Sequence, residues 1–447
     1  MLAISFHTTM SRLRRFFLGA TLLLTLGATL CGAETATLTL QQALASAEGV
    51  NLTVLLGREA AAQALEVANQ SRVSILPIIN ATAQQRRTDS VSISGGRPLS
   101  GVVGNRFDGK FTGSYNLLNA QQISAFRSAR AGVDVAQADY QQTVQLVLTS
   151  VAQTYFTHLR NLSRLDVLNA NIVRSRTLLE LAQNQFAAGV VTRIDVTRAE
   201  ALLELALQAR LQQETVDYQS ELLLKRLLDL DPLQALKLAD FTVQRVDPTR
   251  LGIGADQSTF EQRADWIRAQ RSVDQSKLDV QTARFERLPS LNLSGEYGLA
   301  AANFDDSDKK QAWFAGATIS VPIFDGLRSG ADRRAALSRQ RGQEMRLHTL
   351  ELQISSELLL ARQDASSRNA QITVADKNLK LAREQLTLAQ ERYRQGVADN
   401  REVVEAQTSL AIADDNFVEA VYQYNLSRVE LSRAKGDVRA VLAEKAP

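Results

Sequence analysis

Prolines divide this chain of 447 residues and leave two long stretches without a helix breaker. The seven prolines stand at positions 77, 98, 232, 248, 289, 322 and 447. None falls between residues 99 and 231 or between residues 323 and 446. Proline removes a backbone hydrogen bond and clashes with the preceding turn, so helix interiors exclude it. The two stretches can therefore hold helices far longer than the average helix of a globular protein.

Apolar and small side chains recur every three or four residues through the first of these stretches. The series is Phe126, Ala129, Val133, Ala136, Tyr140, Val144, Val147, Val151, Tyr155, Leu159 and Leu162. A stripe of this width is typical of a coiled coil, and its small members let neighbouring helices approach closely. Aromatic residues make up only 6% of the chain and apolar residues 45%. This composition favours long packed helices over several compact domains.

The chain is an internal duplication, because blocks of sequence recur in the same order at a nearly constant spacing. The matching blocks are Leu76–Asn80 with Leu288–Asn292, Leu118–Asn119 with Phe324–Asp325, Leu181–Gln183 with Leu388–Gln390, and Gly189–Val190 with Gly396–Val397. The period is too long for a solenoid repeat and indicates two equivalent halves. We assign residues 34–230 to the first half, 261–447 to the second and 231–260 to the segment that joins them.

Each half is predicted to contain one long helix and two shorter ones. The long helices are expected at residues 120–188 and 326–395. At ~1.5 Å per residue, each would be about 100 Å long. The shorter helices are expected at residues 51–75, 190–230, 265–287 and 397–437. Placed end to end, the two short helices of a half nearly match its long helix, so we expect them to lie antiparallel to it in series.

Segments with a period of two precede each long helix. They span about residues 77–89, 107–118, 289–300 and 311–324. In the last of them Trp313, Ala317 and Ile319 share one face, while Thr318 lies on the other. Alternation over about 10 residues with aromatic residues near the ends is typical of a transmembrane β-strand. A half-buried strand of a soluble protein has the same pattern, so the strands alone leave both interpretations open.

Residues 1–33 have the pattern of a secretory signal peptide. Arg12, Arg14 and Arg15 precede an apolar run from Phe16 to Leu30, and small residues follow. The run is shorter than the about 20 residues that span a membrane, so a signal is favoured over an anchor. Lipidation of Cys31 is disfavoured because Leu30 precedes it where a small residue is expected.

The predicted signal also changes the charge balance. The chain has 51 basic and 48 acidic residues, and the three arginines of the signal account for the difference. The remaining chain is therefore neutral, which argues against a partner of nucleic acid. Cys31 is the single cysteine, and three scattered histidines cannot form a His-rich metal centre. We expect no cofactor, no metal site and no enzymatic activity.

Four strands in one chain cannot close a membrane barrel, whose smallest form has about eight. An open sheet edge cannot face lipid, because its N–H and C=O groups would lack partners. The strands must therefore pair with other copies of the chain, with apolar side chains such as Phe111, Leu291, Trp313 and Ile319 facing the lipid. Two copies give a barrel filled by side chains, whereas three leave a lumen. Continued by long helices, such a barrel would be a conduit.

The order and spacing of several motifs resemble the TolC-type outer-membrane efflux proteins, the outer membrane factors. The motifs are the two Leu-Pro-x-Leu/Ile-Asn segments, Val321–Gly326 before a long helix, Tyr393–Val397 and Glu402–Ala406. The resemblance covers about residues 36–440. It implies a mainly α-helical fold with a membrane β-barrel portion: a homotrimer with four transmembrane strands per chain, a 12-stranded barrel in the cell outer membrane, and a periplasmic α-barrel.

The function implied by this resemblance is that of an exit channel in a tripartite efflux or type I secretion system. Its partners would be a periplasmic adaptor, an inner-membrane pump and the lipid of the outer membrane. Two other classes remain open from the residues alone. A periplasmic adaptor would need a single helical hairpin between soluble β-domains, whereas this chain has two hairpins. A coiled-coil scaffold without a pore would not explain alternating strands with an apolar face.

The resemblance also implies where the periplasmic entrance lies. Gly189 and Gly396 match the tip turns of the family. Glu402 and Glu405 match an acidic pair that lines the entrance and is open to cations. Trimer symmetry would gather six of these carboxylates around one axis, where they would focus negative potential.

A latch that holds the entrance closed is implied at the same tip. Tyr393 matches the family's latch tyrosine, and Asp195 matches its acidic partner. A basic residue of the family pattern is missing, since Ala398 stands in its place. Arg193 or Arg401 is then expected to substitute for it.

Two further patterns are better explained without chemistry. Residues 104–111 nearly match a phosphate-binding loop, but Phe111 stands where Ser or Thr must reach Mg²⁺ and the segment enters a strand. His158 and His348 stand alone on long helices, where solvent exposure or packing explains them. No arrangement of catalytic residues is recognisable.

Overall fold

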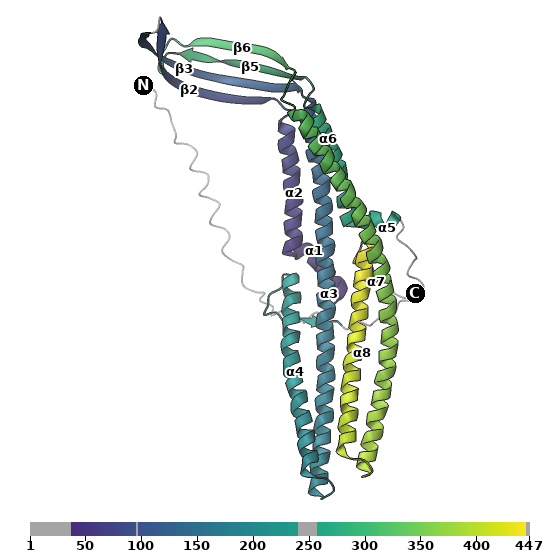
Figure 1. The fold of residues 1–447 in the computed structure, drawn as a ribbon. Helices are drawn as coiled ribbons and strands as arrows, with labels where there is room; N and C mark the ends of the chain where they lie inside the picture. The colour runs from purple at the N-terminus through teal and green to yellow at the C-terminus, as the bar shows by residue number, and fades with distance from the viewer. Residues whose placement is uncertain (1–36, 95–96, 240–256, 444–447) are drawn as a thin grey trace, which may run out of the picture.

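The computed structural model describes residues 37–94, 97–239 and 257–443, and the molecule is strongly elongated (Figure 1). A sheet lies at one end and two helical hairpins form the other. The predicted signal with Cys31 and most of the predicted joining segment lie outside the described residues.

The six predicted helices lie close to their expected positions. The long helices are α3 (Ala120–Ala187) and α7 (Arg328–Arg394). The shorter ones are α2 (Leu52–Val73), α4 (Arg193–Leu227), α6 (Ala264–Phe285) and α8 (Asn400–Lys435). In Figure 1, α2 continues the line of α4 beside α3, and α6 continues that of α8 beside α7. The expected arrangement of one long helix beside two short ones in series is confirmed in both halves.

The helices form a band that is one helix thick. Near the sheet the neighbours follow the order α2, α3, α6, α7, and toward the tip the order is α4, α3, α8, α7 (Figure 1). The two halves therefore meet where α3 packs against α6 and α8. One edge of the band is α2 and α4, and the other edge is α7.

Short elements that the sequence analysis did not predict cluster at the middle of the molecule. They are β1 (Thr37–Leu38), α1 (Leu40–Val50), β4 (Lys237–Leu238), α5 (Gln257–Gln262) and α9 (Ala440–Ala443). β1 and β4 pair in parallel, and the Tyr155 hydroxyl donates to the carbonyls that flank this pairing, Leu38 O at 3.1 Å and Ala239 O at 3.2 Å. Around them α1, α3, α4 and α8 enclose the largest apolar core, which includes Leu44, Leu148 and Leu224.

A buried asparagine joins the ends of α4 and α2. The Asn51 side-chain oxygen accepts hydrogen bonds from the backbone N–H groups of Thr53 and Val54 and so caps α2. Its amide donates at 2.7 Å to Leu227 O, a carbonyl in the last turn of α4. One side chain thus satisfies backbone groups at two helix ends, which otherwise lack partners.

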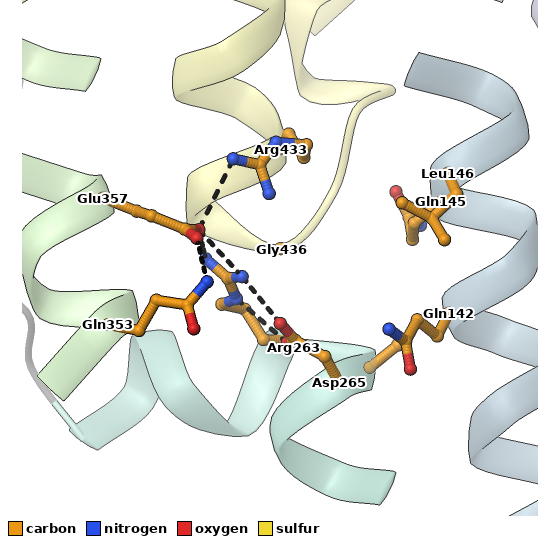
Figure 2. A pocket seen from close by; sticks show the side chains of 10 residues that line it. Gln142, Gln145, Leu146, Arg263, Asp265, Gln353, Glu357, Arg433 and Gly436 are labelled. Atoms are coloured by element: carbon orange, nitrogen blue, oxygen red, sulfur yellow. Dashed lines mark hydrogen bonds and ion pairs between the residues drawn. The ribbon is translucent and has the colours of Figure 1, made fainter. Parts of the chain in front are cut away.

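A buried arginine takes the equivalent position where α8 meets α6 (Figure 2). Arg263 precedes α6 and is only 4% exposed. Its guanidinium donates to Asp265 of α6 at 2.7 Å, to Glu357 of α7 at 3.1 Å and to Ala434 O of α8 at 3.3 Å. Gly436 follows α8 at φ +107, and a Cβ there would lie 2.8 Å from Gln262 O, so only glycine lets the two ends come this close.

The sheet is antiparallel, and its strand order is β2-β3-β5-β6. The strands are β2 (Ile78–Ser94), β3 (Arg97–Leu118), β5 (Ser290–Ala301) and β6 (Lys310–Ser320). Three predicted strand bounds were wrong. β2 ends at Ser94 rather than near residue 89. β3 begins well before residue 107, and β6 ends at Ser320 rather than at 324. Pro322 has no N–H for a ladder bond, and beyond it Asp325 accepts from Leu327 N and Ser329 N, which turns the chain into α7.

Candidate functional site

One face of the sheet is apolar across all four strands. The register places Ala81, Phe111, Tyr297 and Trp313 in one row. The next rows toward the helices contain Gly113 with Gly295 and Ala315, then Tyr115 with Leu293 and Ala317, and then Leu118 with Leu291 and Ile319. Trp313 and Phe111 are 75% and 60% exposed within the chain. A row of aromatic side chains beside an apolar band is the pattern of a lipid-facing sheet.

The opposite face is polar over the same length. Asn116 lies beside Asn292 and Thr318, Ser114 beside Ser294, and Thr112 beside Glu296. The amide of Asn292 donates to Asn116 Oδ1 at 2.8 Å, so polar side chains pair across the strands. The separation of the two faces agrees with the alternation in the sequence, and the register extends it across the strands from the aromatic row to the helices.

At the far end of the helices, both hairpins turn on a glycine. Gly189 has φ +73 and Gly396 has φ +72, the left-handed region that favours glycine. Behind them, Val190 N donates to Gln185 O and Val397 N donates to Arg392 O, both at 2.9 Å. These are the bonds of a Schellman motif, which satisfies the last carbonyls of α3 and α7. The two predicted tip turns therefore have the same backbone geometry.

The helices that leave the two turns are capped by acidic side chains. Asp195 Oδ2 accepts from the Thr192 N–H at 3.0 Å and from the Thr192 hydroxyl at 2.7 Å. Asp399 caps α8 by accepting from the Glu402 N–H at 3.2 Å. The two turns are also joined, because the buried Asn400 donates its amide to Asp195 O at 2.8 Å. Sequence reasoning missed Asn400.

Tyr393 lies between the turns and is buried, with 2% of its surface exposed. Burial raises the pKa of its hydroxyl, and the negative charge of Asp195 raises it further. Within the described chain the hydroxyl has no hydrogen-bond partner. The structure therefore brings Tyr393 and Asp195 together without a bond between them, beside a hollow of about 390 Å³ that both turns line.

Each of the two glutamates that the resemblance assigns to the entrance has an arginine partner within its own chain. Glu402 Oε1 lies 2.7 Å from Arg392 Nη1, and Glu405 Oε1 lies 2.8 Å from Arg401 Nε. Arg401 thus pairs with Glu405, while the cation near Asp195 is Arg198, at 3.6 Å. Arg392 and Arg198 were not anticipated, although the spacing of Asp195 and Arg198 on one helix face could have suggested that pair.

The two hairpins are linked by ion pairs from α3 to α8. Arg160 lies 3.3 Å from Glu419, and Arg164 lies 2.7 Å from Asp415. Closer to the tip, Asp414 lies 3.4 Å from Arg174 of α3 and 3.5 Å from Arg383 of α7. This charge pairing depends on which helices become neighbours, so the sequence of one helix does not reveal it.

The two histidines differ in their surroundings. His158 is buried between α3 and α4, where its Nδ1 lies 2.9 Å from Asp217 Oδ1 and 3.1 Å from Ser220 Oγ. Burial raises the pKa of Asp217 despite the nearby imidazole. His348 is exposed on α7. The prediction that packing or solvent exposure explains the two histidines is confirmed for both. Asp217, the partner of His158, was not predicted.

Other candidate chemistry does not gather into a site. Residues 104–111, which resemble a phosphate-binding loop, lie inside strand β3. Among the described residues, no group of three or more His, Cys, Asp or Glu side chains is placed to hold a metal ion. None of the helices in the described ranges is long and apolar enough to cross a membrane.

The chain is similar to known outer membrane proteins over most of its length. The family model described as outer membrane efflux protein matches residues 39–229 and 257–437. The pyoverdine export outer membrane protein OpmQ of Pseudomonas aeruginosa is 26% identical over 404 residues, covering 88% of this chain and 82% of that protein. The outer membrane protein OprJ of the same species is 26% identical over 409 residues, with coverage of 83% and 82%.

A solved structure has the same fold. The CmeC outer membrane channel of Campylobacter jejuni superposes with a TM-score of 0.78 at 20% sequence identity, and the match covers 91% of this chain and 88% of that one. The similarity therefore extends over most of the length of both chains.

Proposed function

The chain belongs to the outer membrane efflux protein family and is an exit channel of the outer membrane, and we propose that three copies close into one continuous tube. The sheets would join as a 12-stranded barrel, and the helices would join as a tunnel below it. The apolar face would meet the lipid, and the polar face would line the lumen.

The observation that carries this proposal is that every level of the molecule is an open band with two free edges. The sheet ends at β2 and β6, the helices near the sheet end at α2 and α7, and those near the tip end at α4 and α7 (Figure 1). One edge always belongs to the first half and the other to the second. A head-to-tail contact between unlike edges generates a closed ring when the rotation closes.

The edges also have exposed apolar side chains that a neighbouring copy would cover. On α7 they are Leu352, Leu359, Val374, Leu381 and Leu388, and on α4 they are Leu205, Leu211 and Tyr218. Most of the α7 members follow at seven-residue steps, the spacing of a coiled-coil seam. Three copies are proposed because two would give a barrel of about eight strands filled by side chains, whereas twelve strands leave a lumen.

The tip would be the periplasmic entrance of the tube. We assign Glu402 and Glu405 to an entrance ring that governs which ions pass, and Tyr393 with Asp195 to the contact between the two turns that keeps the entrance narrow. The arginines beside each glutamate support a ring of ion pairs rather than of bare carboxylates. A periplasmic adaptor and an inner-membrane pump would deliver the cargo to this end.

Cross-linking between opposite edges tests the closed ring. α4 begins and α7 ends at the tip, so Leu205 and Leu381 lie at nearly the same distance from it. Within one chain, α3 and α8 separate them. Introducing Leu205→Cys and Leu381→Cys and treating the membranes with a short bis-maleimide should therefore link only different copies. We expect bands of two and three chains on a denaturing gel, with none above three.

The control is Leu205→Cys alone, because a ring keeps equivalent positions of different copies apart. Cys31 is the only other cysteine, and the unmodified chain gives its background. A largest product of two chains, or a ladder beyond three, would contradict the trimer. Absence of any product would contradict the pairing of α4 with α7.

A further inference from the structure

An ion pair crosses the polar face of the sheet between its two central strands. Lys110 Nζ of β3 lies 2.8 Å from Glu296 Oε2 of β5, so the two charges neutralise each other. Gly298 stands directly opposite Lys110 in the register. A Cβ at Gly298 would lie 2.5 Å from both Cα and Cβ of Lys110, so only glycine leaves room for the lysine stem beside β5.

An aromatic ring lies next to this ion pair. Phe314 of β6 stands directly opposite Glu296 and is 55% exposed. It is the one aromatic side chain on the polar face of β3, β5 and β6 where their side chains are described. Its ring extends over Gly316, where a Cβ would lie 2.6 Å from Phe314 Cζ. The ring therefore lies along the sheet with one side open.

The ion pair and the ring border one hollow in this face. The hollow measures about 120 Å³, and Arg106 and Asp108 extend it. Arg106 Nε lies 2.9 Å from Asp108 Oδ2, so the second pair of charges is balanced as well. The surface at this height therefore has charges of both signs, and the charges of these four groups sum to zero. It also has one exposed aromatic side chain.

Resting on the proposed barrel, in which the polar face lines the lumen, we propose that Lys110, Glu296 and Phe314 form a second selectivity ring. Threefold symmetry would repeat the three residues at one height. Because each lysine is matched by a glutamate, the ring repels neither cations nor anions, while the phenyl rings contact apolar groups. This chemistry suits small amphipathic molecules that have an aromatic part and no net charge, neutral or zwitterionic.

Ion selectivity in planar bilayers tests the balance of charge. Lys110→Met leaves three unmatched glutamates, so the reversal potential in a salt gradient should shift toward cation selectivity. Glu296→Gln leaves three unmatched lysines and should shift it toward anion selectivity. The double variant restores neutrality and should return to the value of the unmodified channel, although it has lost both charged groups.

Block by a neutral aromatic probe tests the role of Phe314. N-acetyl-tryptophanamide should interrupt the current, and Phe314→Ser should weaken its binding by roughly two- to tenfold, the effect of losing one aromatic contact. Tyr297→Leu is the matched control. Tyr297 is an exposed aromatic residue on the opposite face of the neighbouring strand β5 and does not line the hollow, so its replacement should leave block unchanged.

Two outcomes separate the ring from the channel itself. If the variants form trimers that conduct with unaltered selectivity and block, the ring is refuted and the exit channel stands. If the unmodified protein forms no conducting trimer, the proposed assembly fails and the ring fails with it.

Discussion

Two glycines determine the shape of the tip at the residue scale. Gly189 and Gly396 adopt nearly the same left-handed conformation, and no atom lies within 4 Å of the Cβ that either lacks. The requirement is therefore conformational rather than steric. An L-residue in this region costs about 1–2 kcal/mol.

Replacing Gly396 by alanine should lower the free energy of unfolding by about 1–2 kcal/mol per chain, and Gly396→Asn should cost less because asparagine tolerates this conformation. Gly342 is the control, since it lies inside α7 and a Cβ there would also meet nothing within 4 Å. Gly342→Ala should stabilise by up to about 1 kcal/mol. Circular dichroism recorded during thermal unfolding measures the change in stability of each variant. Equal effects of the two substitutions would argue against the turn geometry.

The two glutamates that we assign to the entrance give a second prediction at this scale. Replacing Glu402 and Glu405 by alanine together leaves Arg392 and Arg401 without their partners. Folding should be nearly unaffected, because exposed substitutions usually cost under about 0.5 kcal/mol. In planar bilayers the freed arginines should move selectivity toward anions relative to the unmodified channel, and block by multivalent cations should weaken because their carboxylate ligands are gone.

Glu344, an exposed residue in the first half of α7, is the control, and Glu344→Ala should leave selectivity unchanged. If the double variant retained cation block as an intact trimer, the entrance ring would be refuted. Reduced efflux in cells with unchanged conductance would instead assign the two glutamates to the adaptor contact.

At the scale of elements, the two halves use different residues to join the ends of their short helices. In each half two short helices meet end to end beside a long one, and one side chain joins the ends. Asn51 does so with a neutral amide, whereas Arg263 uses a charge that also binds α7 (Figure 2). The duplicated backbone is therefore preserved where the side-chain chemistry has diverged.

Removing the charge of Arg263 should lower the free energy of unfolding. Arg263→Met leaves the half-buried Asp265 without its partner, and breaking a buried ion pair costs about 3–5 kcal/mol. Arg433 still lies 3.4 Å from Glu357, so the loss should fall at the lower end of that range. Arg439→Met is the control, because its pair with Glu48 is partly exposed and such pairs contribute about 0–1 kcal/mol. Equal losses in melting temperature would contradict the role of Arg263.

The same cluster predicts a pH dependence of stability. Burial alone would raise the pKa of Asp265 and Glu357, but hydrogen bonds and the charges of Arg263 and Arg433 lower both pKa values overall. A carboxyl whose folded pKa is depressed stabilises above its unfolded pKa of about 4 and loses this contribution as pH falls. Thermal unfolding between pH 7 and pH 3 should therefore show a smaller acid loss in Arg263→Met than in the unmodified protein.

The sheet faces give a further prediction at this scale. Ala317 lies on the apolar face beside Leu293, and Thr318 lies on the polar face beside Asn292. Ala317→Arg would put a charge into lipid and cost roughly 2–4 kcal/mol, whereas Thr318→Arg would face water. Yield of heat-resistant trimer in membranes compares them. Normal assembly of Ala317→Arg with failure of Thr318→Arg would mean that the faces are inverted.

The sequence predicted the features that depend on local periodicity. Helix lengths follow from the proline spacing, and the four strands follow from alternation such as Trp313 to Ile319. The early start of β3 was missed because residues 97–106 contain Pro98, Gly101 and Gly104 and do not alternate. The partners of Arg263, Glu402 and His158 were also missed. The partners Glu357, Arg392 and Asp217 lie on elements distant in sequence or across a turn, so only the packing of helices brings them within reach.

At the scale of the whole molecule, a single chain does not form a closed structure. Its sheet and both helix layers end in free edges, and one face of its sheet exposes Trp313 and Phe111. Neither feature is stable in isolation. A sheet edge in lipid leaves backbone N–H and C=O groups without partners, and an apolar stripe in water favours contact with another apolar surface. Assembly and membrane insertion must therefore complete the fold.

The mass of the protein extracted from outer membranes tests this requirement most directly. Light scattering or native mass spectrometry in detergent, corrected for bound detergent, should give particles of three chains, and omission of detergent should cause precipitation. A stable, water-soluble particle of one chain would contradict the account, because its open edges and apolar sheet face would then need no partner.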